Sequence, residues 1–336
     1  MNEQLGRQTY RLERPPVAVS WANIGGRQEE AGPLSPYFDE LDQDSFFGEK
    51  TWEKAESAMQ KRALGRALEK GGLKAEDIDA VFAGDLLNQC IGTSFGLRDF
   101  AIPFYGLYGA CSTMGESLAL AAMCLGGGFM QKAAAMTSSH FCTAERQYRM
   151  PVPYGSQRTP TAQWTATAAG CTILASEGEG PRITHVTCGK IVDKGIADAN
   201  NMGAAMAPAA CSTLSAFFRE TKTRPEDYDH VVTGDLGALG SQILLELMEA
   251  EGIPLSNHLD CGLLLYDREG QDMHCGASGC GCAASVLNGY LLGGLQDGKW
   301  KKLLFAPTGA LLSPVSSCQG ETIPGICHAI LWEGRL

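Results

Sequence analysis

The residue of this sequence best placed to do chemistry is Cys111, within the segment GACSTMGESLALA at residues 109–121. Gly109 and Ala110 precede the thiol, and an alanine-rich stretch that predicts a helix begins at Ser112. A thiol at the start of a helix lies near the positive end of the helix dipole, which lowers its pKa, and the adjacent N–H groups can bind an oxyanion or a carboxylate. We therefore expect a functional thiol at Cys111; the alternative is one more packed cysteine.

Other candidate ligand groups follow expected strand ends. His140, in SSHFCTAERQ, comes after an expected strand at 132–137 and either faces a pocket or makes a structural hydrogen bond. Asp85 and Asp235 each follow a glycine at a strand end, where an aspartate ordinarily caps a turn. The capping role is preferred for Asp85, whereas both roles stay open for Asp235.

Three arginines lie in a polar segment at 140–165 that predicts a loop or lid. An arginine can hold a ligand carboxylate through paired charge-assisted hydrogen bonds, although most loop arginines are simply solvated. The candidates are Arg146, Arg149 and Arg158.

The elements that must position these residues include an internal repeat. EDIDAVFAGDL at 76–86 and EDYDHVVTGDL at 226–236 lie 150 residues apart and share seven of eleven residues. Helical and strand patterns alternate in both parts of the chain, which predicts mixed sheets covered by helices. We expect two similar α/β halves, 1–180 with Cys111 and 181–336, with equivalent central strands at 79–84 and 229–233 and a site between the halves.

Composition excludes several functional classes. The 336-residue chain has a net charge of −11, which argues against binding nucleic acid. The N-terminal residues carry charges without an apolar signal core, and no apolar run reaches the ~20 residues of a membrane span. Thirteen cysteines without a CxxC pair predict free thiols in a reducing compartment, and no metal site is expected at the one His-Cys cluster, 274–282.

The repeat, the Cys111 turn and the closing segment LLFAPTGALLSP resemble the thiolase superfamily, and within it the ketoacyl synthase III-like condensing enzymes. The resemblance implies a five-layered α-β-α-β-α fold and a homodimer that pairs through an edge of the first half near 131–138. It also implies an acylated cysteine assisted by a His and an Asn from the second half. Here Asp235 stands near the expected His, and Ala277 or Ser278 near the expected Asn.

Six segments in order along the chain resemble more specifically the stage V sporulation protein AD family of endospore-forming bacteria. They are GDLLNQ, GACSTMGESLALA, TSSHFCTAERQYR, NMGAAMAPAA, TGDLGALGS and GASGCGC. The resemblance implies non-catalytic binding of dipicolinic acid (pyridine-2,6-dicarboxylate), its uptake into or release from the spore, no cofactor, and protein partners in a dipicolinate channel. It also implies a peripheral location on the cytoplasmic face of the forespore inner membrane, held there through those partners.

The expected ligand-binding residues combine the two resemblances with the candidates above. They are Cys111, Ser112, His140, Arg149, Asp235, Ala277 and Ser278. The alternative is an active acyltransferase in which Cys111 works with an atypical helper, His140 or His274.

Overall fold

The computed structural model describes residues 2–148 and 158–335, and every structural statement below concerns these residues. The strands form one long mixed sheet in the order β12-β11-β14-β17-β10-β3-β9-β7-β5-β6. The first half supplies β3 (Val17–Gly25), β5 (Ala80–Gly84), β6 (Phe104–Gly106), β7 (Lys132–Ser139) and β9 (Ala168–Ala175). The second supplies β10 (Arg182–Thr187), β11 (His230–Thr233), β12 (His258–Asp260), β14 (Lys302–Ala306) and β17 (Ala329–Glu333).

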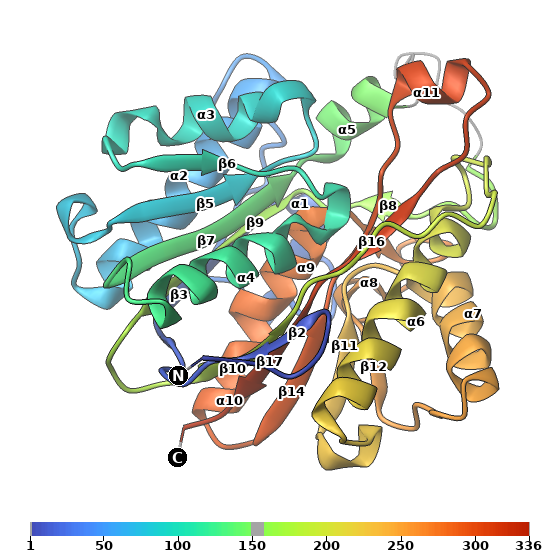
Figure 1. Cartoon of the computed structure of the whole chain (residues 1–336). Coiled ribbons are helices and arrows are strands. Elements are labelled where there is room, and N and C mark those ends of the chain that lie inside the picture. The colour runs from blue at the N-terminus through green and yellow to red at the C-terminus, as the bar shows by residue number, and fades with distance from the viewer. Residues whose placement is uncertain (1, 149–157, 336) are drawn as a thin grey trace.

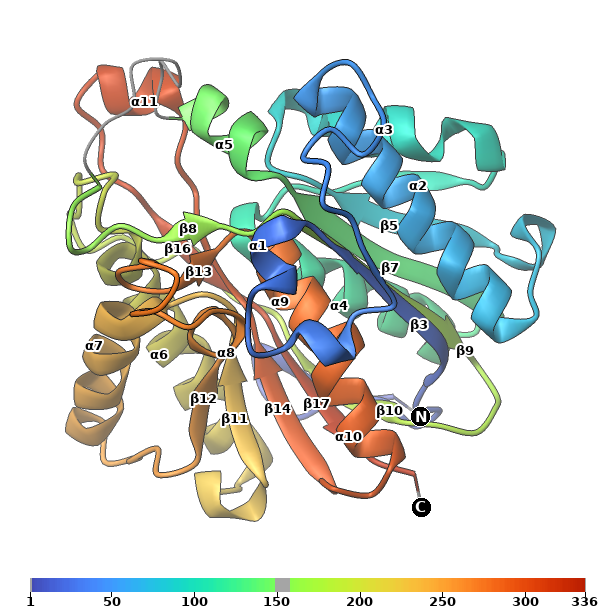
Figure 2. The same ribbon diagram turned by 180° about the vertical axis from the view of Figure 1, so that it is seen from behind.

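Helices cover both faces of each half of this sheet, which gives the five expected layers in the order α-β-α-β-α (Figures 1 and 2). The outer layers are α2 (Trp52–Gly71) with α3 (Ile91–Leu97) on the first half, and α6 (Met202–Thr221) with α7 (Gly237–Ala250) on the second. Between the halves lie α4 (Thr113–Gly126) and α9 (Cys280–Val286); α4 contacts β5 and β7 on one side and β10 and β17 on the other. Three separate hydrophobic clusters fill the spaces between these layers.

The sequence repeat is also a structural repeat. Helices α2 and α6 are offset by 150 residues, and both end at a residue with left-handed backbone, Gly72 or Lys222. The Asp79 carboxylate accepts the backbone N–H groups of residues 131 and 132, and the Asp229 carboxylate accepts those of residues 301 and 302. The prediction of equivalent strands is confirmed, because β5 and β11 each lie between two parallel neighbours. Their expected central position is wrong, since each is the second strand from an outer edge of the sheet.

The expected dimer edge at 131–138 is wrong. Strand β7 fills this segment and is hydrogen-bonded on both sides, to β5 and to β9, so it has no free edge. The edge strand of the first half is β6, and all three of its residues are exposed. Strand β7 is hydrophobic because it is buried between two helical layers and not because it is an edge.

The N-terminal residues add a strand that the sequence patterns did not predict. Strand β2 (Thr9–Arg11) pairs antiparallel with β10, and the Leu12 N–H donates to the carbonyl of Thr184. The Glu220 carboxylate at the end of α6 accepts the N–H groups of residues 7–9. The start of the chain is therefore built into the second half of the sheet.

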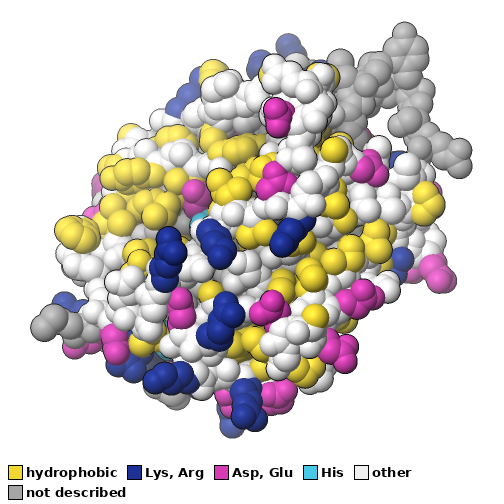
Figure 3. All heavy atoms as spheres, turned by 45° about the vertical axis from the view of Figure 1, so that its right-hand side comes forward, with side chains coloured by type: hydrophobic (Ala, Val, Ile, Leu, Met, Phe, Trp, Pro, Cys, Tyr) yellow, Lys and Arg dark blue, Asp and Glu magenta, His cyan; other side chains and the backbone are white. Residues whose placement is uncertain are grey.

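All thirteen cysteines are free. Within 2–148 and 158–335, no helix is long and apolar enough to cross a membrane, and no group of three side chains could hold a metal ion. On the face drawn in Figure 3, Lys and Arg side chains are interspersed with Asp and Glu instead of forming a continuous basic surface.

Candidate functional site

Cys111 lies on a strained turn between the two halves. It is the middle residue of the one-turn 3-10 helix η5 (Ala110–Ser112) that leads into α4, and Ala110 has a left-handed backbone with φ of 51°. Gly309 of β15 (Thr308–Ala310) packs against this turn so closely that a Cβ on it would lie 2.1 Å from the Gly109 carbonyl oxygen. The second half therefore holds the cysteine turn in place by direct backbone packing.

Two side chains of the second half meet the thiol. The Ser278 Oγ lies 4.0 Å from the Cys111 Sγ and donates to Oδ2 of Asp235 at 3.2 Å. Asp235 Oδ2 also accepts the Gly279 N–H at 2.8 Å, and Oδ1 accepts the Thr308 hydroxyl at 3.3 Å. Cys111, Ser278 and Asp235 thus form one buried cluster, which we call the Cys111 cluster.

The electrostatics of the cluster contradict the lowered pKa that the helix dipole predicts for the Cys111 thiol. Burial first, and the neighbouring Asp235 carboxylate second, raise the pKa of the Cys111 thiol well above its usual value. The dipole of a helix is weaker than these effects because the thiol is buried. Burial likewise raises the pKa of Asp235 to about 7, against lowering by its hydrogen bonds. Cys111 is therefore a neutral thiol at neutral pH.

A narrow cavity lies above the cluster. Its walls include Leu86, Tyr108, Tyr148 and Leu312, and its floor includes Cys111 and Ser278. The two tyrosine hydroxyls are 2.8 Å apart, and the Tyr148 hydroxyl also donates to the Leu86 carbonyl at 2.5 Å. The space open to the centre of a water-sized sphere is only about 40 Å³, so the cavity is narrow. Among the described lining residues there is no Lys, Arg or His, and Glu145 is acidic.

The other predicted site residues lie in different surroundings. The Ser112 side chain is buried and donates to the Gly109 carbonyl at 2.7 Å, so it holds the turn. The His140 Nε2 lies 2.8 Å from the Ser45 carbonyl oxygen, and the ring packs against Phe47, outside the cavity lining. Ala277 contributes its carbonyl oxygen, which accepts from the Gln163 side chain at 2.8 Å.

The remaining charged candidates already have partners or lie outside the structure described. Arg146 pairs with Glu53, and Arg158 pairs with Asp272 at 2.8 Å. His274 contacts Asp272 at 3.2 Å and does not line the cavity. Arg149 falls outside the described residues.

Sequence reasoning missed the tyrosine wall and a second buried acid cluster. Tyr148 belongs to helix α5 (Phe141–Tyr148), which occupies part of the segment expected to be a loop. Below α5, Oε1 of Glu56 accepts the Ser138 hydroxyl at 2.9 Å, and Oε2 lies 2.7 Å from the Thr143 hydroxyl oxygen. Burial and the Asp85 carboxylate raise the pKa of Glu56 to about 8. The signal for this acid was its helical position, four residues from the buried Gln60 on the face that packs on the sheet.

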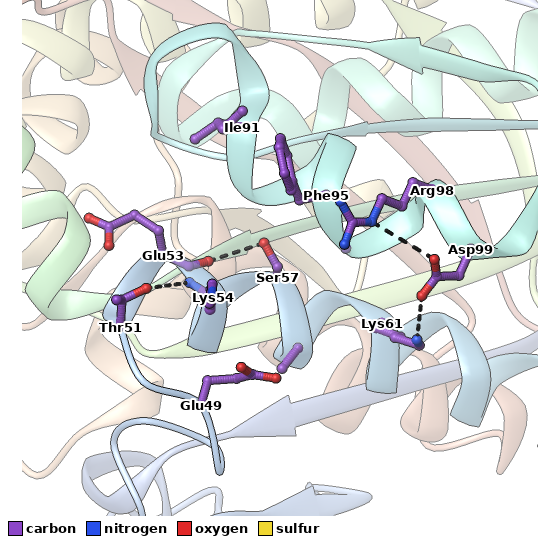
Figure 4. Close-up of a pocket in the computed structure, with 12 residues that line it drawn as sticks. Glu49, Thr51, Glu53, Lys54, Ser57, Lys61, Ile91, Phe95, Arg98 and Asp99 are labelled. Atoms are coloured by element: carbon purple, nitrogen blue, oxygen red, sulfur yellow. Dashed lines mark hydrogen bonds and ion pairs between the residues drawn. The ribbon is translucent and has the colours of Figure 1, made fainter.

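A larger hollow on the surface is a poorer candidate site. It holds about 660 Å³ between α2 and α3, and Figure 4 shows Phe95 of α3 above Lys54, Ser57 and Lys61 of α2. Asp99 pairs with Lys61 at 2.6 Å and lies 3.8 Å from Arg98. The charged side chains of this hollow largely pair with one another, and none of its described lining residues directs a buried polar group toward a ligand.

Comparisons with known proteins match one protein family along nearly the whole chain and agree with the fold. The family model described as stage V sporulation protein AD matches residues 6–333. The stage V sporulation protein AD of Bacillus subtilis (strain 168) is 40% identical over 329 residues, covering 98% of this chain and 97% of that protein.

Solved structures of condensing enzymes and a thiolase share the fold at low sequence identity. The 3-oxoacyl-[acyl-carrier-protein] synthase III from Aquifex aeolicus VF5 has a TM-score of 0.60 at 12% identity, covering 95% of this chain and 99% of that one. A variant of OleA from Xanthomonas campestris has a TM-score of 0.61 at 13% identity, covering 98% and 100%. Human mitochondrial 3-ketoacyl-CoA thiolase in complex with CoA has a TM-score of 0.60 at 12% identity, covering 97% and 99%.

Proposed function

The chain belongs to the stage V sporulation protein AD family, and from this premise we propose that it binds dipicolinic acid in the Cys111 cavity and does not transform it. As a member of that family it is a sporulation protein with a thiolase-like fold. The proposed role is to bind dipicolinate during its movement into or out of the spore, together with other proteins of a dipicolinate channel at the spore inner membrane.

The observation that carries the non-catalytic part is the composition of the Cys111 cluster. A condensing reaction needs a thiolate nucleophile and preorganised donors for the thioester oxygen. Here the thiol is neutral, and the side chains that meet it are a carboxyl group and a hydroxyl that already donates to that carboxyl. Neither alternative helper, His140 or His274, lines the cavity.

The cavity also has features suited to a small planar aromatic acid. Tyr108 and Tyr148 give it an aromatic wall, and the floor ends in a thiol and a hydroxyl. Because the open space is about 40 Å³, binding requires Tyr148 and α5 to move outward. The described lining has no cation, so Arg149, the residue after Tyr148, stays our candidate partner for a ligand carboxylate.

Thermal unfolding with dipicolinate tests whether this ligand binds in the Cys111 cavity. At ~100 times its dissociation constant the ligand should stabilise the fold by about 2.7 kcal/mol and raise the melting temperature by a few degrees. Cys111→Trp should fill the cavity and abolish the shift, whereas the matched control Cys318→Trp, at an exposed cysteine, should retain it. Isomeric pyridine dicarboxylates should shift the melting temperature less. An equal shift in the Cys111→Trp protein would place the ligand elsewhere.

A separate assay tests the absence of catalysis. Intact-mass measurement after incubation with acetyl-CoA and malonyl thioesters should find no acylated Cys111. Condensation products that disappear in the Cys111→Ala protein would instead support the acyltransferase alternative.

We also propose a homodimer, now through β6 in place of the segment near 131–138. Strand β6 has one unpaired edge, and Phe104 and Tyr105 on it are 40% and 51% exposed. An open strand edge with apolar side chains pairs readily with another strand. Light scattering should give a dimer mass at micromolar concentration, and Phe104→Pro should give a monomer.

A further inference from the structure

We infer that an anionic ligand enters the Cys111 cavity together with one proton, and that Asp235 holds this proton. The inference rests on the proposed function, because it concerns how the same cavity accepts a dicarboxylate. It makes Asp235 a positioning residue that acts on the ligand through Ser278, since Ser278 lines the cavity and Asp235 lies behind it.

The first step concerns the single proton of the Ser278 hydroxyl. When Asp235 is ionised, this proton is donated to Oδ2 of Asp235 across 3.2 Å. A hydroxyl has one proton, so Ser278 then presents only lone pairs to the cavity. The floor is negative in this state and repels a carboxylate.

The second step reverses the direction of the same hydrogen bond. A protonated Asp235 can donate its O–H to the Ser278 Oγ across the same distance, because a hydroxyl both donates and accepts. The Ser278 proton is then free to point into the cavity and donate to a ligand carboxylate. Protonation therefore changes the cavity floor from an acceptor to a donor without moving the backbone.

The groups facing Asp235 supply no positive charge within the described part of the chain. They are the thiols of Cys111, Cys280, Cys282 and Cys261, the last at the start of α8 (Cys261–Leu265), and the carboxyl group of Asp260 at the end of β12. His258 lies beside Asp260 and not beside Asp235. Burial first, with a contribution from Asp260, raises the pKa of Asp235 to about 7, so uptake of a proton near neutral pH is available.

Asp85, the counterpart of Asp235 in the repeat, indicates why Asp235 can change its protonation state. Asp85 accepts the Leu87 N–H at 2.8 Å and both the N–H and the hydroxyl of Thr93, so its oxygens serve the loop that follows β5. Asp235 accepts only one backbone N–H, and its other partners are the hydroxyls of Ser278 and Thr308, which can reverse, and the Cys111 thiol. The same position in the repeat is therefore fixed in the first half and switchable in the second.

Calorimetric titration with dipicolinate between pH 6 and 9, in two buffers of different ionisation enthalpy, tests whether a proton is taken up on binding. The ligand carboxyls ionise near pH 4 or below and contribute no change in this range. Cys111, Tyr108 and Tyr148 also stay neutral, because burial raises their pKa values. Binding should take up as much as one proton, and Kd should rise about tenfold per pH unit above the pKa of Asp235.

Two variants separate this inference from the proposed function. Asp235→Asn, which cannot ionise, should bind with a Kd independent of pH and without proton uptake, whereas Asp85→Asn should keep the wild-type profile. Binding of dipicolinate to the wild type with a pH-independent Kd overturns the inference alone. No binding at any pH overturns the proposed function and the inference with it.

Discussion

Glu56 offers a sharp test of how the buried polar groups are charged. The Thr143 Oγ1 lies 2.7 Å from Oε2 of Glu56 and 2.9 Å from the His140 carbonyl oxygen. One hydroxyl proton cannot serve both acceptors, so the arrangement is satisfied if Glu56 is protonated and donates to Thr143. Glu56→Gln copies this neutral acid, because an amide also combines one acceptor oxygen with a donor group.

The expected effect on stability follows from the pKa of Glu56. Its pKa rises from 4.5 to about 8 on folding, mainly through burial and next through Asp85. The stability associated with the proton is complete below about pH 4.5 and is lost as the pH rises through about 8. Each pKa unit corresponds to about 1.4 kcal/mol, so this linkage amounts to roughly 5 kcal/mol across the window.

Chemical denaturation at pH 5, 6, 7 and 8 measures this loss. The free energy of unfolding of the wild type should fall by about 1.4 kcal/mol per pH unit from this group, and Glu56→Gln should remove that slope. Glu69→Gln, at an exposed position of the same helix, should keep the wild-type slope. If the wild type and Glu56→Gln lose stability in parallel, Glu56 is ionised in the folded protein and the reasoning is wrong.

Three further predictions concern packing. Gly309→Ala should lower the melting temperature and abolish the dipicolinate shift, because its Cβ would overlap the Gly109 carbonyl; an unchanged melting temperature would contradict the close packing. Asp79→Asn and Asp229→Asn should each reduce the free energy of unfolding by about 1 kcal/mol, because each aspartate accepts one pair of backbone N–H groups in a different half. The two losses should add in the double variant, and strong non-additivity in chemical denaturation would contradict their independence. Tyr148→Phe should leave folding intact but speed alkylation of Cys111, because it removes the hydrogen bond to Leu86 that closes the cavity; an unchanged alkylation rate would count against that closure.

The sequence predicts well the features that depend on local pattern. The repeat and the Cys111 turn each follow from short segments, whereas the placement of Asp235 and Ser278 beside Cys111 is expected from the family resemblance. The state of the thiol does not follow, because burial depends on β15 and α9, which arrive from about 170 or more positions further along the chain.

Two other errors have the same origin. The direction of His140 is set by the carbonyl of Ser45, in an irregular segment whose path has no periodic pattern. The edge of the sheet is β6 and not β7, because strand order is a property of the assembled sheet and is not set by either segment alone. Side chains whose partners lie far away in sequence are thus the ones that local patterns misplace.

The pairing of β2 with β10 has a consequence for the time course of synthesis. Strand β10 follows β2 by about 170 residues, which at about 5–20 residues synthesised per second is a delay of roughly 10–35 seconds. The Glu220 carboxylate that accepts the N–H groups of residues 7–9 comes later still. During this interval β2 has only its local pairing with β1 (Glu3–Gln4) and lacks β10, so this segment is accessible to proteases and chaperones.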